Sequence, residues 1–166
     1  MNVSWNDAQA FCEWLNQIKS VDLPKGYIFR LPTEAEWEKA ARGEYGNEWP
    51  WGNEFDQAKC NSSEGGKGGT TPVGAYSSAG DSPYGAADMA GNAWEWTQSL
   101  YRDYPYKHVD GREKIKTDGN RVLRGGSFYD VLRIARCAYR SWLLPNYFNL
   151  KLGFRVCVSP IITSEL

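Results

Sequence analysis

The chain has 166 residues, of which 42% are hydrophobic and 23% charged, and its formal net charge is −1. These values are typical of one folded domain with a hydrophobic core of its own. A charge so close to neutral excludes the strongly basic surface with which proteins bind nucleic acids or anionic membranes. No run of about twenty apolar residues occurs, so the sequence predicts no membrane-spanning helix and no membrane insertion.

The four cysteines, Cys12, Cys60, Cys137 and Cys157, lie far apart and form no Cys-x-x-Cys pair. This spacing argues against a zinc ribbon and leaves any disulfide pairing open. Eight tryptophans, ten tyrosines and seventeen glycines favour a loop-rich fold whose core is anchored by aromatic rings. No signal peptide opens the chain, so the compartment stays open.

The chain begins with a predicted helix. Ser4 is a preferred N-cap residue, and large or small apolar side chains follow it at helical spacing. These are Trp5, Ala8, Phe11, Cys12, Leu15 and Ile18. Pro24 and Gly26 end this helix, and Tyr27–Leu31 reads as a short strand.

A second helix is predicted from a capping box. Thr33 and Glu36 have the Ser/Thr-x-x-Glu spacing in which each residue bonds the backbone of the other, and the helix runs to Arg42 before Gly43 stops it. Trp37, Ala40 and Ala41 share one side of this helix and are expected in the core.

The remaining chain alternates loops and short strands. Residues 43–91 have little periodicity, and such a loop needs partners for its backbone carbonyls, bound metal being one option. Gly65–Gly69 lacks the spacing of a phosphate-binding loop and reads as a flexible turn. Trp94 and Trp96 are expected to face the core from a short strand. Arg102–Asn120 reads as a surface excursion, and strands are expected at 122–123 and 154–158.

Four phrases stand out in order along the chain: Arg30–Arg42 (RLPTEAEWEKAAR), Gly91–Thr97 (GNAWEWT), Arg121–Phe128 (RVLRGGSF) and Gly153–Val156 (GFRV). Together they resemble the formylglycine-generating enzyme, or sulfatase-modifying factor, family. The resemblance implies an α+β domain with the C-type-lectin-like fold of that family: two helices, short twisted antiparallel strands and long ordered loops. It implies one domain over residues 1–160 and a tail at 161–166. Members usually carry a further strand and helix ahead of the VSWNDA phrase, which this sequence does not show.

The resemblance also implies a calcium site. Asp88, Gly91, Ala93 and Glu95 match the ligands of one family site, with two carboxylates and two backbone carbonyls around a glycine turn. Asn61 matches a ligand of the family's other calcium site, whose later ligands fall in a segment that is shortened here. The alternative is that Asp88 and Glu95 only hydrogen-bond loop backbone.

The family's catalytic cysteine pair is not matched in this sequence. Formylglycine generation needs two cysteines after the Gly-Gly-Ser phrase to hold cuprous ion, and Asp130 stands at the first of these positions. Cys137 matches a different family cysteine and reads as a small buried hydrophobe. Related iron enzymes need a histidine cluster, whereas this chain has the single histidine His108. We therefore expect no enzyme activity and neither copper nor iron; the alternative is a peptide-modifying oxidase.

Between fixed family positions lies a segment, 128–152, that is rich in large apolar residues and fits neither strand nor helix periodicity. Such a segment is either deep core or an exposed binding surface. In the second case Arg124, Arg136, Arg140 and Arg155 are the frame that holds it. The predicted ligand-binding residues are Tyr129, Asp130, Val131, Leu132, Ile134, Tyr139, Ser141, Trp142, Leu143, Leu144, Asn146, Tyr147, Phe148, Asn149 and Leu150.

This pattern is similar to the variable proteins of diversity-generating retroelements, in which adenine-directed mutagenesis converts asparagine codons within the same frame. Most of the predicted ligand-binding residues are amino acids that mutated asparagine codons can encode. Trp142 and Lys151, which lie in the same segment, are not. The competing interpretation is an ordinary non-catalytic family member with drifted loops. The sequence thus predicts recognition of a protein or other macromolecule, not of nucleic acid, and leaves the oligomeric state open.

Overall fold

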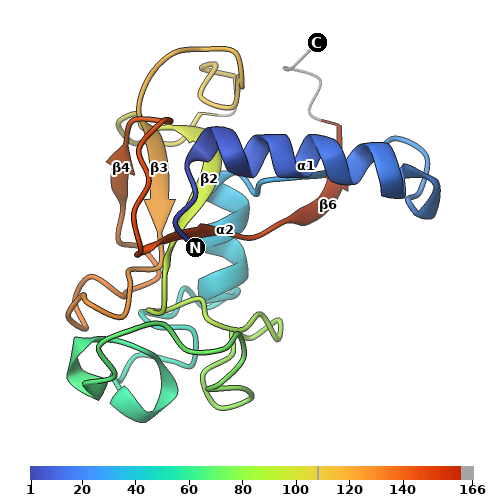
Figure 1. Ribbon diagram of the computed structural model, residues 1–166. Coiled ribbons are helices and arrows are strands. Elements are labelled where there is room, and N and C mark those ends of the chain that lie inside the picture. The colour runs from blue at the N-terminus through green and yellow to red at the C-terminus, as the bar shows by residue number, and fades with distance from the viewer. Residues whose placement is uncertain (108, 162–166) are drawn as a thin grey trace.

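The computed structural model describes residues 1–107 and 109–161 (Figure 1). The helices are α1 (Trp5–Lys19) and α2 (Glu34–Arg42), with short 3₁₀ turns elsewhere. The strands are β1 (Tyr27–Arg30), β2 (Trp94–Leu100), β3 (Arg121–Arg124), β4 (Ser141–Leu143), β5 (Leu152–Phe154) and β6 (Cys157–Pro160). His108 and most of the predicted tail, residues 162–166, lie outside the described residues.

The strands form two sheets. One has the order β4-β3-β2-β5, and the other is the pair β1-β6, which joins the strand that follows α1 to the last strand. Strand β2 runs antiparallel to β3 but parallel to β5, so the expected antiparallel arrangement has one exception. The predicted strand at 154–158 divides into β5 and β6, because the chain leaves one sheet at Phe154 and enters the other at Cys157.

Helix α1 begins as predicted. The Ser4 hydroxyl accepts a hydrogen bond from the Asp7 N–H, and the Asp7 carboxylate accepts one from the Ser4 N–H. Only the N-terminal part of the predicted apolar face is buried, at Trp5, Ala8 and Cys12. Phe11 and Ile18 are exposed, contrary to the prediction, because helical spacing identifies a face but not how far the sheet covers it. Neither described helix is long and apolar enough to cross a membrane.

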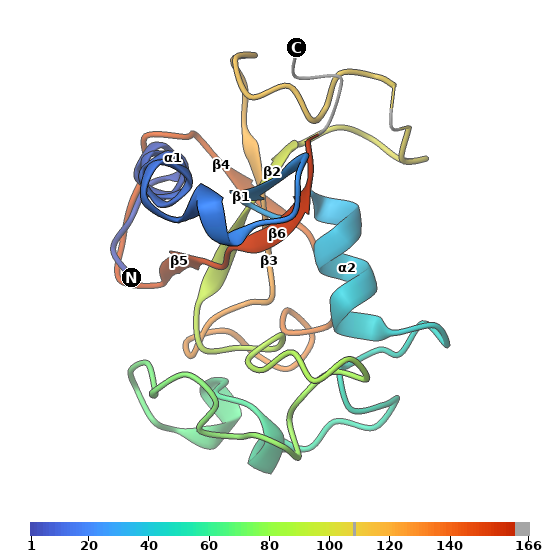
Figure 2. The same ribbon diagram turned by 90° about the vertical axis from the view of Figure 1, so that its right-hand side faces the viewer.

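The two helices lie on opposite faces of the four-stranded sheet (Figure 2). Successive side chains along a strand point to opposite faces of the sheet, so neighbouring positions contact different helices. Trp96 on β2 and Leu123 on β3 pack with Trp5 of α1. Their neighbours Glu95 and Arg124 instead reach α2, where Trp37 Nε1 donates to Glu95 and Arg124 pairs with α2 carboxylates.

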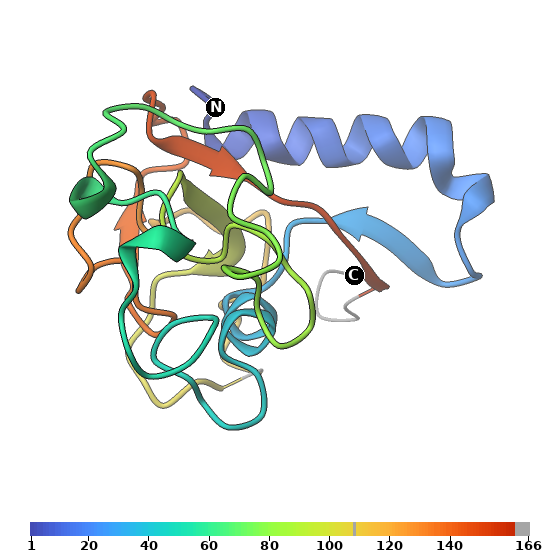
Figure 3. The same ribbon diagram turned by 90° about the horizontal axis from the view of Figure 1, so that it is seen from below.

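The long loop at 43–91 is ordered by hydrogen bonds to other loops. Asn61 forms a bridge with Gly91, and the Asn92 N–H donates to the Asn61 carbonyl at 2.8 Å. Gly91 has φ of 76°, and a Cβ there would lie 2.2 Å from the Asn61 oxygen, so only glycine fits. Seen from below, this loop lies beside the chain that follows β3 (Figure 3). It therefore forms the base on which that chain rests.

The segment 102–120 is more than the predicted surface excursion. Arg112 and Glu113 are buried, and the Glu113 carboxylate accepts from the hydroxyls of Ser99 and Tyr106. Burial raises the pKa of Glu113 above its ordinary value, although these two donors oppose the rise. The prediction failed because a polar composition does not show which charged groups find buried partners.

Candidate binding surface

The segment 128–152 leaves β3 through two glycines with positive φ. Gly126 has φ of 72°, and a Cβ there would lie 3.2 Å from the Ala135 Cα, so the chain turns back closely on itself. Asp130 holds this turn, because its carboxylate accepts from the Ser127 N–H at 3.0 Å and from the Ser127 hydroxyl. The residue at the family's first cysteine position thus stabilises the backbone of the turn.

Buried ion pairs fix the chain just before the segment and at its middle. Arg124 is fully buried and pairs with Glu34 and Glu38 of α2. Arg140 binds both carboxylate oxygens of Glu34. Burial opposes the charge of each group, so such pairs persist only with good geometry. Here they tie β3 and the approach to β4 to the buried start of α2.

A third ion pair lies beyond the segment. Arg155 donates to both carboxylate oxygens of Glu95 and to the Ala87 carbonyl. Arg136 differs from the other three predicted frame arginines, since it pairs with Glu48 at 3.4 Å where both side chains are about two-fifths exposed. Exposed pairs of this kind stabilise little. The frame is therefore Arg124, Arg140 and Arg155, and Arg136 is at most a minor part of it.

The loop 43–91 supports the first part of the segment, at residues 130–132. The Ser63 N–H donates to the Asp130 carbonyl, and the Leu132 N–H donates to the Glu64 carboxylate. Trp49 Nε1 donates to the Leu132 carbonyl at 3.3 Å. The backbone at 130–132 is thus hydrogen-bonded from one side, and the Val131 and Leu132 side chains are exposed.

None of the fifteen predicted ligand-binding residues is fully buried. The half-buried ones are Asp130, Ile134, Tyr139, Ser141, Leu143 and Asn149. The exposed ones are Tyr129, Val131, Leu132, Trp142, Leu144, Asn146, Tyr147, Phe148 and Leu150. Tyr129 at 68% and Phe148 at 59% exposure show that large rings face outward, which excludes the deep-core interpretation. We call these exposed side chains the 128–152 surface.

Two of the exposed rings, Tyr129 and Trp142, have different neighbours. Lys151 Nζ lies 3.9 Å from the centre of the Tyr129 ring, so the start and the end of the segment meet there. Trp142 on β4 instead contacts Tyr101, with ring centres 6.1 Å apart. Leu143 alternates to the opposite face, packs against the α1 core and is half-buried, so the prediction that it is a substantially exposed binding residue was wrong.

Sequence reasoning missed Tyr101 and Tyr104. Both are exposed, and the Arg140 guanidinium lies between them, 4.5 Å and 4.4 Å from their ring centres. Cations attract the faces of aromatic rings, so the stack holds both tyrosines in place. The tyrosine-rich composition of 101–106 was the available signal, but nothing in the sequence placed it beside Arg140.

Three of the four predicted calcium ligands share one hollow. Asp88, Ala93 and Glu95 line a cavity of about 620 Å³ together with Asn92 and Arg155. Asp88 accepts from the Gly74 N–H at 2.9 Å, while Glu95 is shared by Arg155 and Trp37. Across residues 1–107 and 109–161, no three His, Cys, Asp or Glu side chains form a metal cluster by themselves. The predicted site, which counts two carbonyls among its ligands, stays a prediction.

The side-chain oxygen of Asn61 is a further candidate ligand for a cation. Asn61 is buried, and its Oδ1 accepts no hydrogen bond from any described residue, although a buried acceptor normally finds a partner. Its backbone is joined to Gly91, a predicted calcium ligand.

All four thiols lie in surroundings that keep them protonated. Burial raises the pKa of Cys137 to about 12 and that of Cys12, Cys60 and Cys157 to about 11. The thiolate is the form that attacks substrates and binds soft metals. Cys137 is buried, as predicted, and so are Cys12 and Cys60, whereas Cys157 is half-buried.

A family model described as the sulfatase-modifying factor enzyme 1-like domain matches residues 1–160. The inactive C-alpha-formylglycine-generating enzyme 2 of Bos taurus is 36% identical over 175 residues, covering 96% of this chain and 49% of that protein. The formylglycine-generating enzyme of Mus musculus is 34% identical over 183 residues, covering 99% of this chain and 45% of that protein. The chain thus spans about half the length of these curated relatives.

Among solved structures, Treponema denticola variable protein 1 has the same fold. It matches with a TM-score of 0.76 at 25% sequence identity, and the match covers 93% of this chain and 69% of that chain. The chain is therefore similar to a formylglycine-generating enzyme, to a relative named inactive and to a variable protein.

Proposed function

The chain belongs to the family of sulfatase-modifying factor enzyme 1-like domains, and from this premise we propose that it is a non-catalytic protein that recognises a macromolecular target through the 128–152 surface. The family and the α+β, C-type-lectin-like fold predicted from the four phrases are confirmed. So is the resemblance to variable proteins.

The observation that carries the proposal is the outward direction of large apolar side chains on a fixed backbone. Leu144, Tyr147 and Leu150 are exposed to 58%, 48% and 69%, and they follow a strand that the buried Arg140–Glu34 pair holds in place. Exposed apolar side chains gathered in one segment usually mark an interaction site. A fixed backbone loses little conformational entropy on binding, which favours affinity.

An oxidase remains the second candidate, because the Mus musculus relative is named a formylglycine-generating enzyme. The non-catalytic proposal is supported by Asp130, which stabilises the turn where that chemistry needs a thiolate. It is supported too by the raised pKa of all four thiols. The family also includes the inactive Bos taurus relative.

Calcium is proposed as a structural ion held by Asp88, Glu95 and the carbonyls of Gly91 and Ala93. Hard cations take carboxylate and carbonyl oxygens, and calcium accepts six to eight of them in flexible arrangements. The shared hollow and the unpartnered Asn61 Oδ1 support an oxygen-rich cation site in this region. Calcium there would share the Glu95 carboxylate with Arg155 and so strengthen the loop beneath the 128–152 surface.

The target-binding proposal is tested by comparing the wild-type chain with a variant in which Tyr129, Trp142, Tyr147 and Phe148 are replaced by Ser. Both are immobilised and crosslinked in extracts of the source cells, and captured proteins are quantified by mass spectrometry. We expect a protein enriched at least tenfold by the wild type and absent with the variant. Equal capture by the two would contradict the proposal.

Diversification is tested on the gene. A neighbouring reverse transcriptase gene and a near-identical template repeat of the 128–152 coding region are expected. Sequencing of many descendants should then show substitutions at exposed positions of the segment and none at Arg124 or Gly125. A gene without such neighbours and with an invariant segment would leave an ordinary family member with drifted loops.

A further inference from the structure

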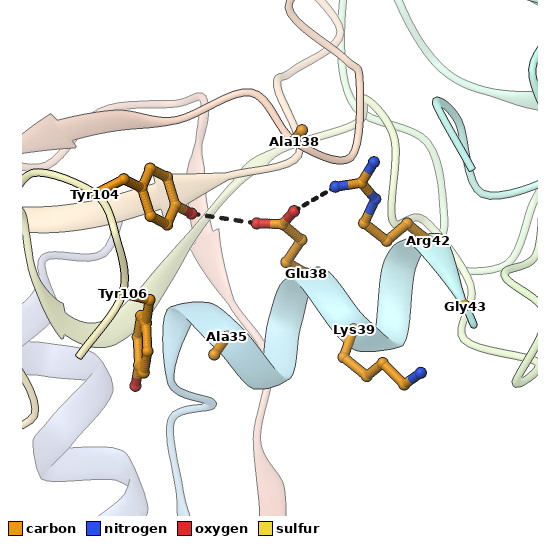
Figure 4. Close-up of a pocket in the computed structure, with 8 residues that line it drawn as sticks. All are labelled: Ala35, Glu38, Lys39, Arg42, Gly43, Tyr104, Tyr106 and Ala138. Carbon is orange, nitrogen blue, oxygen red and sulfur yellow. Dashed lines mark hydrogen bonds and ion pairs between the residues drawn. The ribbon is translucent and has the colours of Figure 1, made fainter. Parts of the chain in front are cut away.

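A groove runs along the solvent side of α2, between this helix and the segments 104–106 and 136–140. It consists of two hollows of about 510 Å³ and 660 Å³ that share Arg42 and Ala138. The α2 residues that line it, Ala35, Glu38, Lys39 and Arg42, have the spacing of one helix face. Figure 4 shows Glu38 between Tyr104 and Arg42, with Ala138 above it. We call this site the α2 groove.

The charges beneath the α2 groove do not balance. The connected ion pairs join three guanidiniums, Arg42, Arg124 and Arg140, to only two carboxylates, Glu34 and Glu38. Arg42 and Arg140 line the groove, so the surplus positive charge reaches its surface.

The other charged residues on the walls add to this surplus. Lys39 is exposed and has no carboxylate partner among the described residues, and its Nζ lies 5.9 Å from the centre of the Tyr84 ring. Arg136 is balanced by Glu48. The α2 groove is therefore positive within a chain whose net charge is −1, which favours an anionic occupant.

Hydrogen-bond donors are also left over on these walls. Arg42 Nε is buried and donates to no described residue, although its other nitrogens bind Glu38 and the Gly46 carbonyl. Ala138 is exposed, and its backbone takes part in none of the hydrogen bonds among the described residues. An extended backbone can use such a free peptide group.

The walls are apolar as well as charged. Tyr104 and Tyr106 flank one hollow and Tyr139 flanks the other. A small anion would use the cations but would leave these rings and the length of the site unused. We propose that the α2 groove binds an extended, acidic polypeptide segment of a partner protein. The exposed rings of the 128–152 surface do not line this groove, and the proposal does not depend on their function.

The test is fluorescence anisotropy with a labelled peptide of about eight residues, long enough to lie extended along both hollows, in which aspartate and leucine alternate. The same peptide with lysine in place of aspartate is the control ligand. Saturable binding of the acidic peptide alone is expected, and its affinity should fall as salt is added, because salt screens the attraction between charges.

Two variants locate the peptide. Ala138→Trp fills the junction of the hollows from an exposed position, and Lys39→Glu reverses the unpaired charge. Each should raise the Kd at least about tenfold, which corresponds to ~1.4 kcal/mol. Lys67→Glu makes the same charge change at an exposed lysine outside the groove, and Phe148→Ser removes an exposed ring from the 128–152 surface. Both should leave the Kd unchanged within about twofold.

Three results would overturn the proposal: no saturable binding of the acidic peptide, equal binding of the lysine peptide, or an equal effect of Lys67→Glu and Lys39→Glu. A single-stranded oligonucleotide that binds more tightly than the peptide would instead assign the groove to nucleic acid. Melting curves of Ala138→Trp and Lys39→Glu check that both variants fold.

Discussion

The ion-pair frame and the 128–152 surface reverse the usual distribution of side chains. The frame, which consists of Glu34, Glu38, Glu95, Arg124, Arg140 and Arg155, places charges in the interior. The surface places Tyr, Trp, Phe and Leu side chains in solvent. Charged residues are rarely buried unless paired, and large apolar residues rarely gather outside without a partner.

The difference shows how stability and recognition are carried by separate residues. Arg124 binds two carboxylates and the carbonyls of Cys137 and Tyr139, so it fixes the backbone without using any exposed side chain. The Tyr129 ring, by contrast, is exposed and lies beneath Lys151 at the end of its own segment. The outer side chains can therefore change while the backbone that presents them stays in place.

The largest effect on stability is expected at the centre of the frame. Arg124→Ala removes one partner of Glu34, one partner of Glu38 and the donor to two carbonyls. Breaking a buried pair in this way costs about 3–5 kcal/mol, because buried charge is left less well compensated. Urea unfolding of the variant measures this loss.

Arg136→Ala is the matched control, since its pair with Glu48 is exposed. We expect a loss below about 1 kcal/mol. Equal losses for the two variants would remove the distinction between buried frame and exposed pair.

Calcium should stabilise the chain by the next largest amount. An ion that binds only the folded state at one hundred times its Kd contributes about 2.7 kcal/mol. Chelator should therefore lower the melting temperature of the metal-loaded wild type, and Asp88→Asn should abolish this shift. A melting temperature that chelator leaves unchanged would show that Asp88 and Glu95 serve only as hydrogen-bond acceptors.

Acid should weaken the frame through Glu38. Burial alone would raise the pKa of this carboxyl, but Arg124 and Arg42 outweigh burial and hold it below its ordinary value of 4.5. A lowered folded-state pKa means that its contribution is complete above pH 4.5 and is lost as the pH falls through the folded value. The free energy of unfolding of Glu38→Gln should therefore depend less on pH below 4.5 than that of the wild type. Parallel pH profiles would contradict this.

The sequence predicted the helices well because their signals are local. The capping pairs Ser4–Asp7 and Thr33–Glu36 lie within one turn, and both form as hydrogen-bonded boxes. The sequence also identified the family from four short phrases and the exposure of the surface from the aperiodic pattern of 128–152.

It could not predict contacts between distant positions. The Arg140–Glu34 pair joins residues 106 positions apart, and no periodicity links them. The exposure of the Phe11 and Ile18 side chains and the burial of Glu113 have the same cause. Composition shows which side chains could be buried, but the fold decides which of them are covered.

The smallest effect on stability is expected from the 128–152 surface itself. Replacing Tyr129, Leu132, Trp142, Leu144, Tyr147 and Phe148 by Ser removes only exposed side chains. Each such change usually alters stability by less than about 0.5 kcal/mol. Target binding should nevertheless be lost, because a few aromatic anchors carry most of the binding free energy, and we expect Trp142, held beside Tyr101, to be the strongest. Serine at Trp14 and Ile18, which are exposed on α1, is the matched control and should leave both stability and binding intact. If the six-residue variant unfolds while the α1 control does not, the surface is part of the core in solution, and the separation between frame and surface fails.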